Sequence, residues 1–253
     1  MRSKINAGEA QRLRDKGLQL QIRSNDTIDR ESVSAEPPRD CARCERLVAF
    51  RHEAQAAHRD WFNAPVPTFA AAEPRLLIVG LAPGLRGANR TGRPFTGDFA
   101  GTLLYETLLT YGLATGTYAE RIDDGLQLNG CAITNAVRCV PLQNKPLPSE
   151  IANCRPYLSA TIASFPKLEA ILALGRIAHE SVLRAFGLKL SDFPFAHGGE
   201  HRFSTREGTS LVLFDSYHCS RYNTNTGRLT ASMFHQVFDS IRARIEIQPA
   251  AVG

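Results

Sequence analysis

The sequence has no apolar run long enough to cross a bilayer. A membrane-spanning helix needs about 20 consecutive apolar residues, and no stretch of this 253-residue chain approaches that length. Residues 1–25 are basic and polar, and they lack the apolar centre of a secretory signal. We therefore expect a cytoplasmic protein with no membrane partner.

The usual nucleotide-binding fingerprints are also missing. No G-x-G-x-x-G follows the first strongly apolar segment, which excludes the common dinucleotide-binding turn. Residues 87–92 have the glycine spacing of a P-loop, but Arg93 and Pro94 stand where that loop needs a lysine and a serine or threonine. The sequence thus argues against binding of a nucleoside triphosphate.

A zinc ribbon normally has two C-x2-C pairs, and this sequence has one, at Cys41 and Cys44. Structural disulfides are rare in cytosolic proteins, so six cysteines favour metal or cluster ligation. An iron–sulfur cluster needs four thiolates and tolerates wide spacing, which suits a set completed by Cys139 and Cys154. We interpret these four cysteines as ligands of a [4Fe–4S] cluster.

The stretch 76–101 is the strongest feature that the sequence does contain. Its apolar start, through Gly80, is typical of a strand buried on both faces, and a loop rich in Gly, Pro, Asn and Arg follows. Apolar residues then recur at helical spacing from Phe99 on, with Asp98 in the N-cap position. A strand, a polar loop and a helix N-terminus therefore meet here, as they do at many binding sites.

Strands and helices alternate along the rest of the chain, and we expect one domain over residues 41–253 after an exposed or partly helical tail over residues 1–40. The remaining strands are predicted at 130–137, 168–174 and 211–214. The main helices after residue 148 are predicted at 149–165, 176–186 and 229–245, the first capped by Ser149. This order predicts a three-layer α/β/α fold with a central, mainly parallel four-stranded sheet.

Polar residues follow each predicted strand at its carboxyl end. Asn135 ends the second strand, Gly175 follows the third and His218 follows the fourth. Open α/β sheets bind their ligands at this edge, so these residues and the loop after Gly80 should converge on one crevice. The net charge of +5 and arginine-rich stretches at 86–93, 202–206 and 221–228 favour a polyanionic partner, although a basic protein without an acidic ligand is the alternative.

Four ordered motifs and the cysteine set together resemble the uracil-DNA glycosylase superfamily, and within it the iron–sulfur family 5, or type B, enzymes. The motifs are GLAPG, GANRTGRPFTGD, TNAVRC and YHCSRYNTNTGRLT. The resemblance implies an enzyme that rotates a damaged nucleotide out of DNA and hydrolyses the bond between base and deoxyribose. No lysine in these motifs stands out as a Schiff-base nucleophile, so a monofunctional glycosylase that leaves an abasic site is expected.

The resemblance also implies roles for single residues. Phe95 matches the ring on which the base stacks, Asn135 the amide that reads its edge, and His218 the donor near O2 of the departing base. Gly80 and Ala82 belong to the base pocket. Other branches carry Asp, Asn or Glu where this chain has Leu81 and Ala82, and Asn89 is the best substitute here, with Asp98 second.

The fourth motif should enter the minor groove of DNA, with Arg221 or Tyr222 as the wedge that fills the vacated space. Its expected DNA contacts are Ser220, Arg221, Tyr222, Asn223 and Arg228. The cluster, held by the four cysteines, would have a structural role. We expect a monomer that acts on uracil and other deaminated bases such as hypoxanthine, in double- or single-stranded DNA of the nucleoid.

Two other functions fit parts of the sequence. The missing acid at Leu81 and Ala82 is compatible with an iron–sulfur protein that binds damaged or abasic sites in DNA without cutting them. The cysteine set by itself is compatible with an iron–sulfur redox protein. A product assay separates both from a glycosylase.

Overall fold

A computed structural model describes residues 34–205 and 208–246. Its main sheet has six strands in the order β1-β5-β2-β6-β8-β7. These strands are β1 (Phe69–Ala70), β2 (Leu76–Gly80), β5 (Cys131–Asn135), β6 (Ala170–Leu174), β7 (Glu200–Ser204) and β8 (Ser210–Ser216). A separate pair, β3 (Ala114–Thr115) and β4 (Gln127–Leu128), is antiparallel.

The four predicted strands are the four central ones, and they pair with one another in parallel. The predicted count of four was wrong, because antiparallel strands β1 and β7 extend the two edges. β1 has two residues, which is too short for a periodic signal. β7 reads EHRFS and is half-exposed, so it lacks the apolar run of the central strands.

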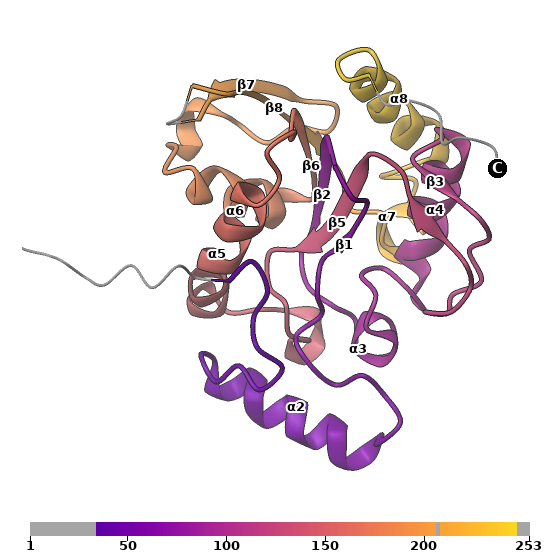
Figure 1. The fold of residues 1–253 in the computed structure, drawn as a ribbon, viewed down its shortest axis with the longest axis vertical. Coiled ribbons are helices and arrows are strands. Elements are labelled where there is room, and N and C mark those ends of the chain that lie inside the picture. The colour runs from indigo at the N-terminus through magenta and orange to yellow at the C-terminus, as the bar shows by residue number, and fades with distance from the viewer. Residues whose placement is uncertain (1–33, 206–207, 247–253) are drawn as a thin grey trace, which may run out of the picture. The chain divides into compact units, whose positions relative to one another are not determined.

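Seven α-helices are described, and they flank the sheet and its loops (Figure 1). They are α2 (Glu45–Ala57), α3 (Ala88–Thr91), α4 (Phe99–Thr110), α5 (Pro148–Ala163), α6 (Arg176–Ala185), α7 (Arg221–Asn225) and α8 (Ala231–Arg242). Two short 3-10 helices lie at η1 (Leu142–Asn144) and η2 (Leu190–Asp192). None of the described helices has the length and apolarity that a membrane span requires.

The side chains of β2 explain the three layers, because successive residues of a strand point to opposite faces. Leu76 and Ile78 pack in one core with apolar residues of α4 and α8. Leu77 and Val79 pack in a second core with residues of α5 and α6. Figure 1 shows these two helix pairs on opposite sides of the sheet, so the predicted α/β/α arrangement is confirmed.

Two predicted local details were wrong. α5 begins at Pro148, and its N-cap is Leu147 in place of Ser149. A proline is favoured at a first helical position because its missing N–H needs no partner there. The final helix, α8, is shorter than predicted and is capped by Thr230, whose hydroxyl accepts from the Met233 backbone N–H at 3.1 Å. The polar segment after His218 contains the short helix α7.

The tail predicted over residues 1–40 lies outside the described residues except for residues 34–40, and this short part contacts the domain. The carbonyl of Ala35 accepts from the Thr161 hydroxyl at 2.9 Å. The Glu36 carboxylate pairs at 2.8 Å with Arg138, whose side chain is fully buried. Residues 35 and 36 therefore anchor the start of the described chain to α5 and to the segment after β5.

Candidate active site

Gly80, at the end of β2, lies where a side chain would not fit. A Cβ atom on Gly80 would come within 2.5 Å of the Asn135 amide oxygen and within 2.5 Å of the Phe95 ring. Gly80 also pairs with Asn135 in the parallel register of β2 and β5. Three residues predicted for the base pocket thus meet at the carboxyl edge of the sheet, as expected for a ligand site in this kind of fold.

Asn135 presents an amide that nothing in the described structure satisfies. The residue is only 3% exposed, and its side chain makes no hydrogen bond to any described residue. The buried side-chain atoms without a partner in the described part of the chain belong to Arg138 and Arg155, so the Asn135 amide is in contact with solvent. Solvent is then the partner that a bound molecule would replace. The amide offers two N–H donors and one acceptor to a bound molecule.

His218 lies beside Phe95 after the end of β8. The two rings are 5.8 Å apart between centroids and inclined by 26°, which is a stacked arrangement. Asn223 donates its amide to the His218 carbonyl at 2.8 Å, and the Ser220 hydroxyl caps α7 by accepting from the Asn223 backbone N–H. Burial lowers the pKa of His218 to about 4, so its imidazole is neutral at pH 7 and keeps one N–H to donate.

Asp98 caps α4 and directs its carboxylate toward the loop after β2. It accepts from the Gly101 backbone N–H at 3.3 Å. A Cβ atom on Gly87 would lie 2.6 Å from the Asp98 Oδ2 atom, which leaves no room for a side chain there, and one on Gly84 would lie 3.2 Å from it, a tight contact. Burial raises the pKa of Asp98, whereas its bonds to backbone N–H groups at the helix start lower it.

Asn89, in α3, is buried and held by Asn63. Its amide nitrogen donates to the Asn63 Oδ1 atom at 2.9 Å, and its carbonyl accepts from the Asn63 backbone N–H at 3.0 Å. Asn63 in turn donates to the His58 carbonyl at 2.6 Å. No described residue donates to the Asn89 Oδ1 atom, which leaves it as an acceptor for water.

Two arginines of the fourth motif lie on aromatic rings, while its tyrosine is open to solvent. The Arg221 guanidinium sits 5.2 Å from the Phe99 ring centroid, and that of Arg228 sits 4.6 Å from the Tyr217 centroid. Tyr222 is 72% exposed. Arg221, Tyr222 and Arg228 are thus the exposed members of the five predicted DNA contacts. The side chains of the other two, Ser220 and Asn223, form hydrogen bonds within the protein.

The four cysteines singled out by their spacing line one cavity. Each sulfur lies near a polar group. The Tyr157 hydroxyl is 3.8 Å from the Cys41 sulfur, and the Asn153 amide is 3.7 Å from that of Cys44. The Arg51 guanidinium is 3.8 Å from the Cys139 sulfur, and the Arg138 backbone N–H is 3.3 Å from that of Cys154. Ala82, predicted for the base pocket, packs against the apolar residues around these cysteines. The cysteine cavity is thus adjacent to the loop after β2.

The donor set fits a cluster better than a single metal ion. Four sulfurs at about 2.3 Å from one zinc ion would lie about 3.8 Å apart, but no three of the four come within 4.8 Å of one another. Arg51 is buried and pairs with no carboxylate among the described residues, so its charge is matched only by the neighbouring sulfur and carbonyl groups. Such a cation favours a centre with negative thiolates.

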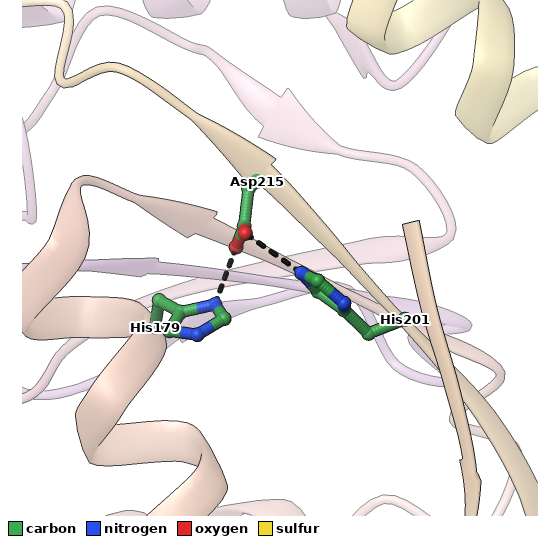
Figure 2. Close-up of side chains that lie close together, drawn as sticks. All are labelled: His179, His201 and Asp215. Carbon is green, nitrogen blue, oxygen red and sulfur yellow. Dashed lines mark hydrogen bonds and ion pairs between the residues drawn. The ribbon is translucent and has the colours of Figure 1, made fainter. Parts of the chain in front are cut away.

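A second group of possible metal ligands, His179, His201 and Asp215, ties α6 and β7 to β8 (Figure 2). Asp215 is fully buried, 2.7 Å from the His179 Nδ1 atom and 3.0 Å from the His201 Nε2 atom. Ligands at about 2.0 Å from a tetrahedral zinc ion would be about 3.3 Å apart. The shorter distances are those of hydrogen bonds, and we assign the group to the support of β8, which leads to His218.

Sequence analysis missed Asn63 and Tyr118, which contact Asn89 and the Phe95 backbone respectively. Both lie outside the four motifs, and neither has a spacing that links it to them. Asn63 has a positive φ of 45°, a conformation in which asparagine is enriched, but the sequence does not reveal which asparagine adopts it.

Comparison with known proteins supports the resemblance drawn from the motifs. The family model of the "Uracil DNA glycosylase superfamily" matches residues 67–242. The "Type-5 uracil-DNA glycosylase" of Thermus thermophilus is 44% identical over 202 residues, which cover 78% of this chain and 90% of that protein. The proteins of the same name from Mycobacterium bovis and Pyrobaculum aerophilum are 40% and 35% identical, again over 78% of this chain and over 75% and 86% of their own lengths. This chain therefore belongs to the uracil DNA glycosylase superfamily.

Proposed function

We propose that this protein is a monofunctional glycosylase that removes uracil from DNA by hydrolysis and leaves an abasic site. The observation that carries the proposal is the meeting of Gly80, Phe95, Asn135 and His218 at one edge of the sheet. The relatives of this chain are named for uracil-DNA glycosylase activity. Together they support an enzyme that accepts a flipped base between an aromatic ring and an amide.

Recognition of uracil is assigned to Phe95 and Asn135. The Phe95 ring supplies a stacking surface, and the glycine at position 80 lets the ring and the Asn135 amide both approach the end of β2. The Asn135 amide can donate to O4 of uracil and accept from its N3–H. Cytosine presents the reverse pattern at these two atoms, so an amide held in one orientation rejects it.

Departure of the base is assigned to the neutral imidazole of His218. Negative charge develops on O2 of uracil as the glycosidic bond breaks, and an N–H donor placed there stabilises the transition state more than the ground state. A depressed pKa keeps this histidine neutral, so the positioned N–H acts as a donor without carrying a charge of its own. Asn223 and Ser220 fix the backbone that carries it.

The attacking water is assigned to Asn89, with Asp98 as a supporting carboxylate. The Asn89 Oδ1 atom can accept a hydrogen bond from water and orient it, but an amide is too weak a base to remove its proton. When ionised, the Asp98 carboxylate faces the loop after β2 and adds negative charge that stabilises a cationic sugar. A dissociative cleavage needs no stronger nucleophile, because a sugar cation reacts with neutral water.

The substrate range is proposed to include other deaminated bases such as hypoxanthine. Leu81 and Ala82 provide no polar side chain to restrict the pocket. Exposed Tyr222 is assigned as the wedge in the minor groove, since Arg221 is held on Phe99. Arg221 and Arg228 are available for the DNA backbone.

The four-cysteine cavity is proposed to hold a [4Fe–4S] cluster with a structural role. When bound, such a cluster supplies four strong iron–thiolate bonds that link distant chain segments. Cys41 and Cys44 precede α2, whereas Cys139 follows β5 and Cys154 lies in α5. Arg51 and the Arg138 backbone N–H would donate to the sulfurs and balance their charge.

Incubation of the protein with a duplex containing one uracil, followed by alkali, tests the proposed function. We expect a single strand break at the uracil after alkali and no break before it, because a monofunctional enzyme leaves the backbone intact. Asn135→Ala serves as the matched control. DNA that is bound tightly but gives no alkali-sensitive site would instead identify a protein that binds damage without cutting.

A further inference from the structure

The stacking residue Phe95 has an unusual backbone. Its φ is +58°, in the left-handed region that residues other than glycine avoid at a cost of about 1–2 kcal/mol. The ring nevertheless packs tightly enough against Gly80 that a Cβ atom there would collide with it. Such a conformation persists only when surrounding contacts determine it, and strained residues of this kind cluster at functional sites.

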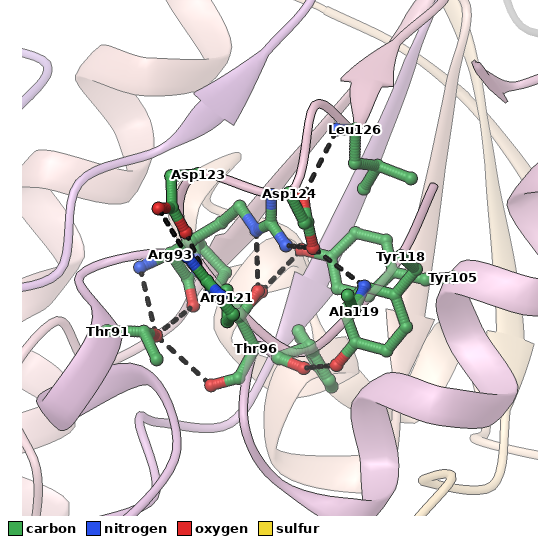
Figure 3. Close-up of polar contacts among 12 residues, drawn as sticks. Thr91, Arg93, Thr96, Tyr105, Tyr118, Ala119, Arg121, Asp123, Asp124 and Leu126 are labelled. Carbon is green, nitrogen blue, oxygen red and sulfur yellow. Dashed lines mark hydrogen bonds and ion pairs between the residues drawn. The ribbon is translucent and has the colours of Figure 1, made fainter. Parts of the chain in front are cut away.

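The hydroxyl groups of Tyr118, Tyr105 and Thr91, three residues labelled in Figure 3, bond to backbone carbonyls at and beside Phe95. The Tyr118 hydroxyl donates to the Phe95 carbonyl at 3.2 Å, and the Tyr105 hydroxyl donates to the Pro94 carbonyl at 2.6 Å. The Thr91 hydroxyl donates to the Thr96 carbonyl at 3.1 Å. Three successive carbonyls, of residues 94–96, are thereby fixed by side chains.

A buried ion pair places Tyr118 for this contact. Arg93 and Asp124 form two parallel hydrogen bonds at 2.8 and 2.7 Å, and their side chains are 2% and 1% exposed. Asp124 also accepts from the Ala119 and Leu126 backbone N–H groups at 2.9 and 3.1 Å. The loop between β3 and β4, which carries Tyr118, is therefore tied to the residue two positions before Phe95.

The remaining packing leaves little room for another arrangement. The Arg93 guanidinium lies 5.9 Å from the Tyr118 ring centroid and 5.4 Å from that of Tyr105, and the two tyrosine rings stack at 4.5 Å. A Cβ atom on Gly101 would collide with both the Phe95 carbonyl and the Tyr118 hydroxyl. The contact between Tyr118 and Phe95 thus requires glycine at position 101.

We propose that Tyr118 is a positioning residue for base stacking: through its hydroxyl, it holds Phe95 in the left-handed conformation that aims the ring beside Asn135 and His218. Arg93 and Asp124 act through Tyr118 by fixing its loop. The inference rests on the proposed function, in which Phe95 stacks the flipped base. It adds a residue far from the four motifs to the determinants of base binding.

Tyr118→Phe tests this role because it removes only the hydroxyl. One hydrogen bond contributes about 1 kcal/mol, so kcat/KM for a uracil-containing duplex should fall about fivefold, mainly through KM. The affinity for a duplex with an abasic-site analogue should stay unchanged, since that DNA has no base to stack. Tyr111→Phe is the matched control: its hydroxyl bonds to the His235 carbonyl and the Asp239 carboxylate, away from Phe95, and its kcat/KM should match that of the wild type.

An unchanged kcat/KM in Tyr118→Phe, or an equal loss of affinity for abasic DNA, would overturn the proposal. A crystal structure of Tyr118→Phe, which shows the φ angle of Phe95, separates failure of this proposal from failure of the proposed function. If the wild type releases no uracil, the proposed function fails, and the Phe95 backbone then decides the role of Tyr118. A changed φ at Phe95 supports it, and an unchanged φ contradicts it.

Discussion

Replacement of Asn135 by alanine should abolish most uracil excision without weakening the fold. The side chain is nearly buried, and none of the described residues hydrogen-bonds to it. In Asn135→Ala, O4 and N3–H of a bound uracil would face an apolar wall without partners. Each unsatisfied group costs about 1–3 kcal/mol, so the loss of about 2–6 kcal/mol corresponds to a fall in kcat/KM of roughly 30-fold to 25,000-fold.

Single-turnover cleavage of a uracil duplex measures this loss, and thermal unfolding of the same preparation measures stability. Because the substitution breaks no hydrogen bond within the described structure, the melting temperature should stay within about 2 °C of the wild type. Excision at a near-normal rate would refute the role of Asn135 in reading the base. A large drop in melting temperature would show that its amide supports the fold instead.

Four further predictions concern other parts of the site. Because burial lowers the pKa of His218 from 6.5 to about 4, its imidazole stays neutral, and the excision rate should not fall through its protonation between about pH 8 and pH 6. The stability that the neutral histidine contributes is complete above about pH 6.5 and declines as the pH falls toward 4. A pH series of excision rates and melting temperatures checks both, and a rate that titrates near pH 6.5 would contradict the assignment. Asp98→Asn, which keeps a good helix cap, should slow the single-turnover rate less than Asn89→Ala, and the reverse order would identify Asp98 as the residue that orients water. Cys139→Ser should lose the visible absorption of the cluster and its iron. Cys131→Ser, at a buried cysteine that does not line the cavity, should keep both, and iron retained in Cys139→Ser would remove Cys139 from the ligand set. Tyr222→Ala should lower kcat/KM on duplex DNA about tenfold or more and change it little on single-stranded DNA, where no base pair is broken, and equal effects on the two substrates would exclude a wedge.

The central architecture could be predicted because each of the four parallel strands contains a run of apolar residues. Runs such as 76–79 and 170–174 are buried on both faces, so each gives a strong local signal. Asn135 and His218 follow two of these strands, and parallel topology alone placed them at one edge. The edge strand β7 was missed because it has no apolar run of its own. It is a strand because it pairs with β8.

The contacts that hold the site could not be predicted in this way. Asp124 lies 31 positions after Arg93, and Asn63 lies 26 positions before Asn89. Each pair depends on how a loop folds back onto the motif, and a loop of ordinary polar residues carries no periodic signal. The sequence therefore predicted residues that the structure brings together at one edge of the sheet, and the structure was needed to find those that position them.

Analysis of the base released from a duplex with one uracil tests the central claim most directly. The account predicts free uracil in an amount equal to the abasic sites formed, with the DNA backbone intact until alkali is added. Tight binding of the duplex with all uracil still attached, by protein that carries its full iron content, would contradict it.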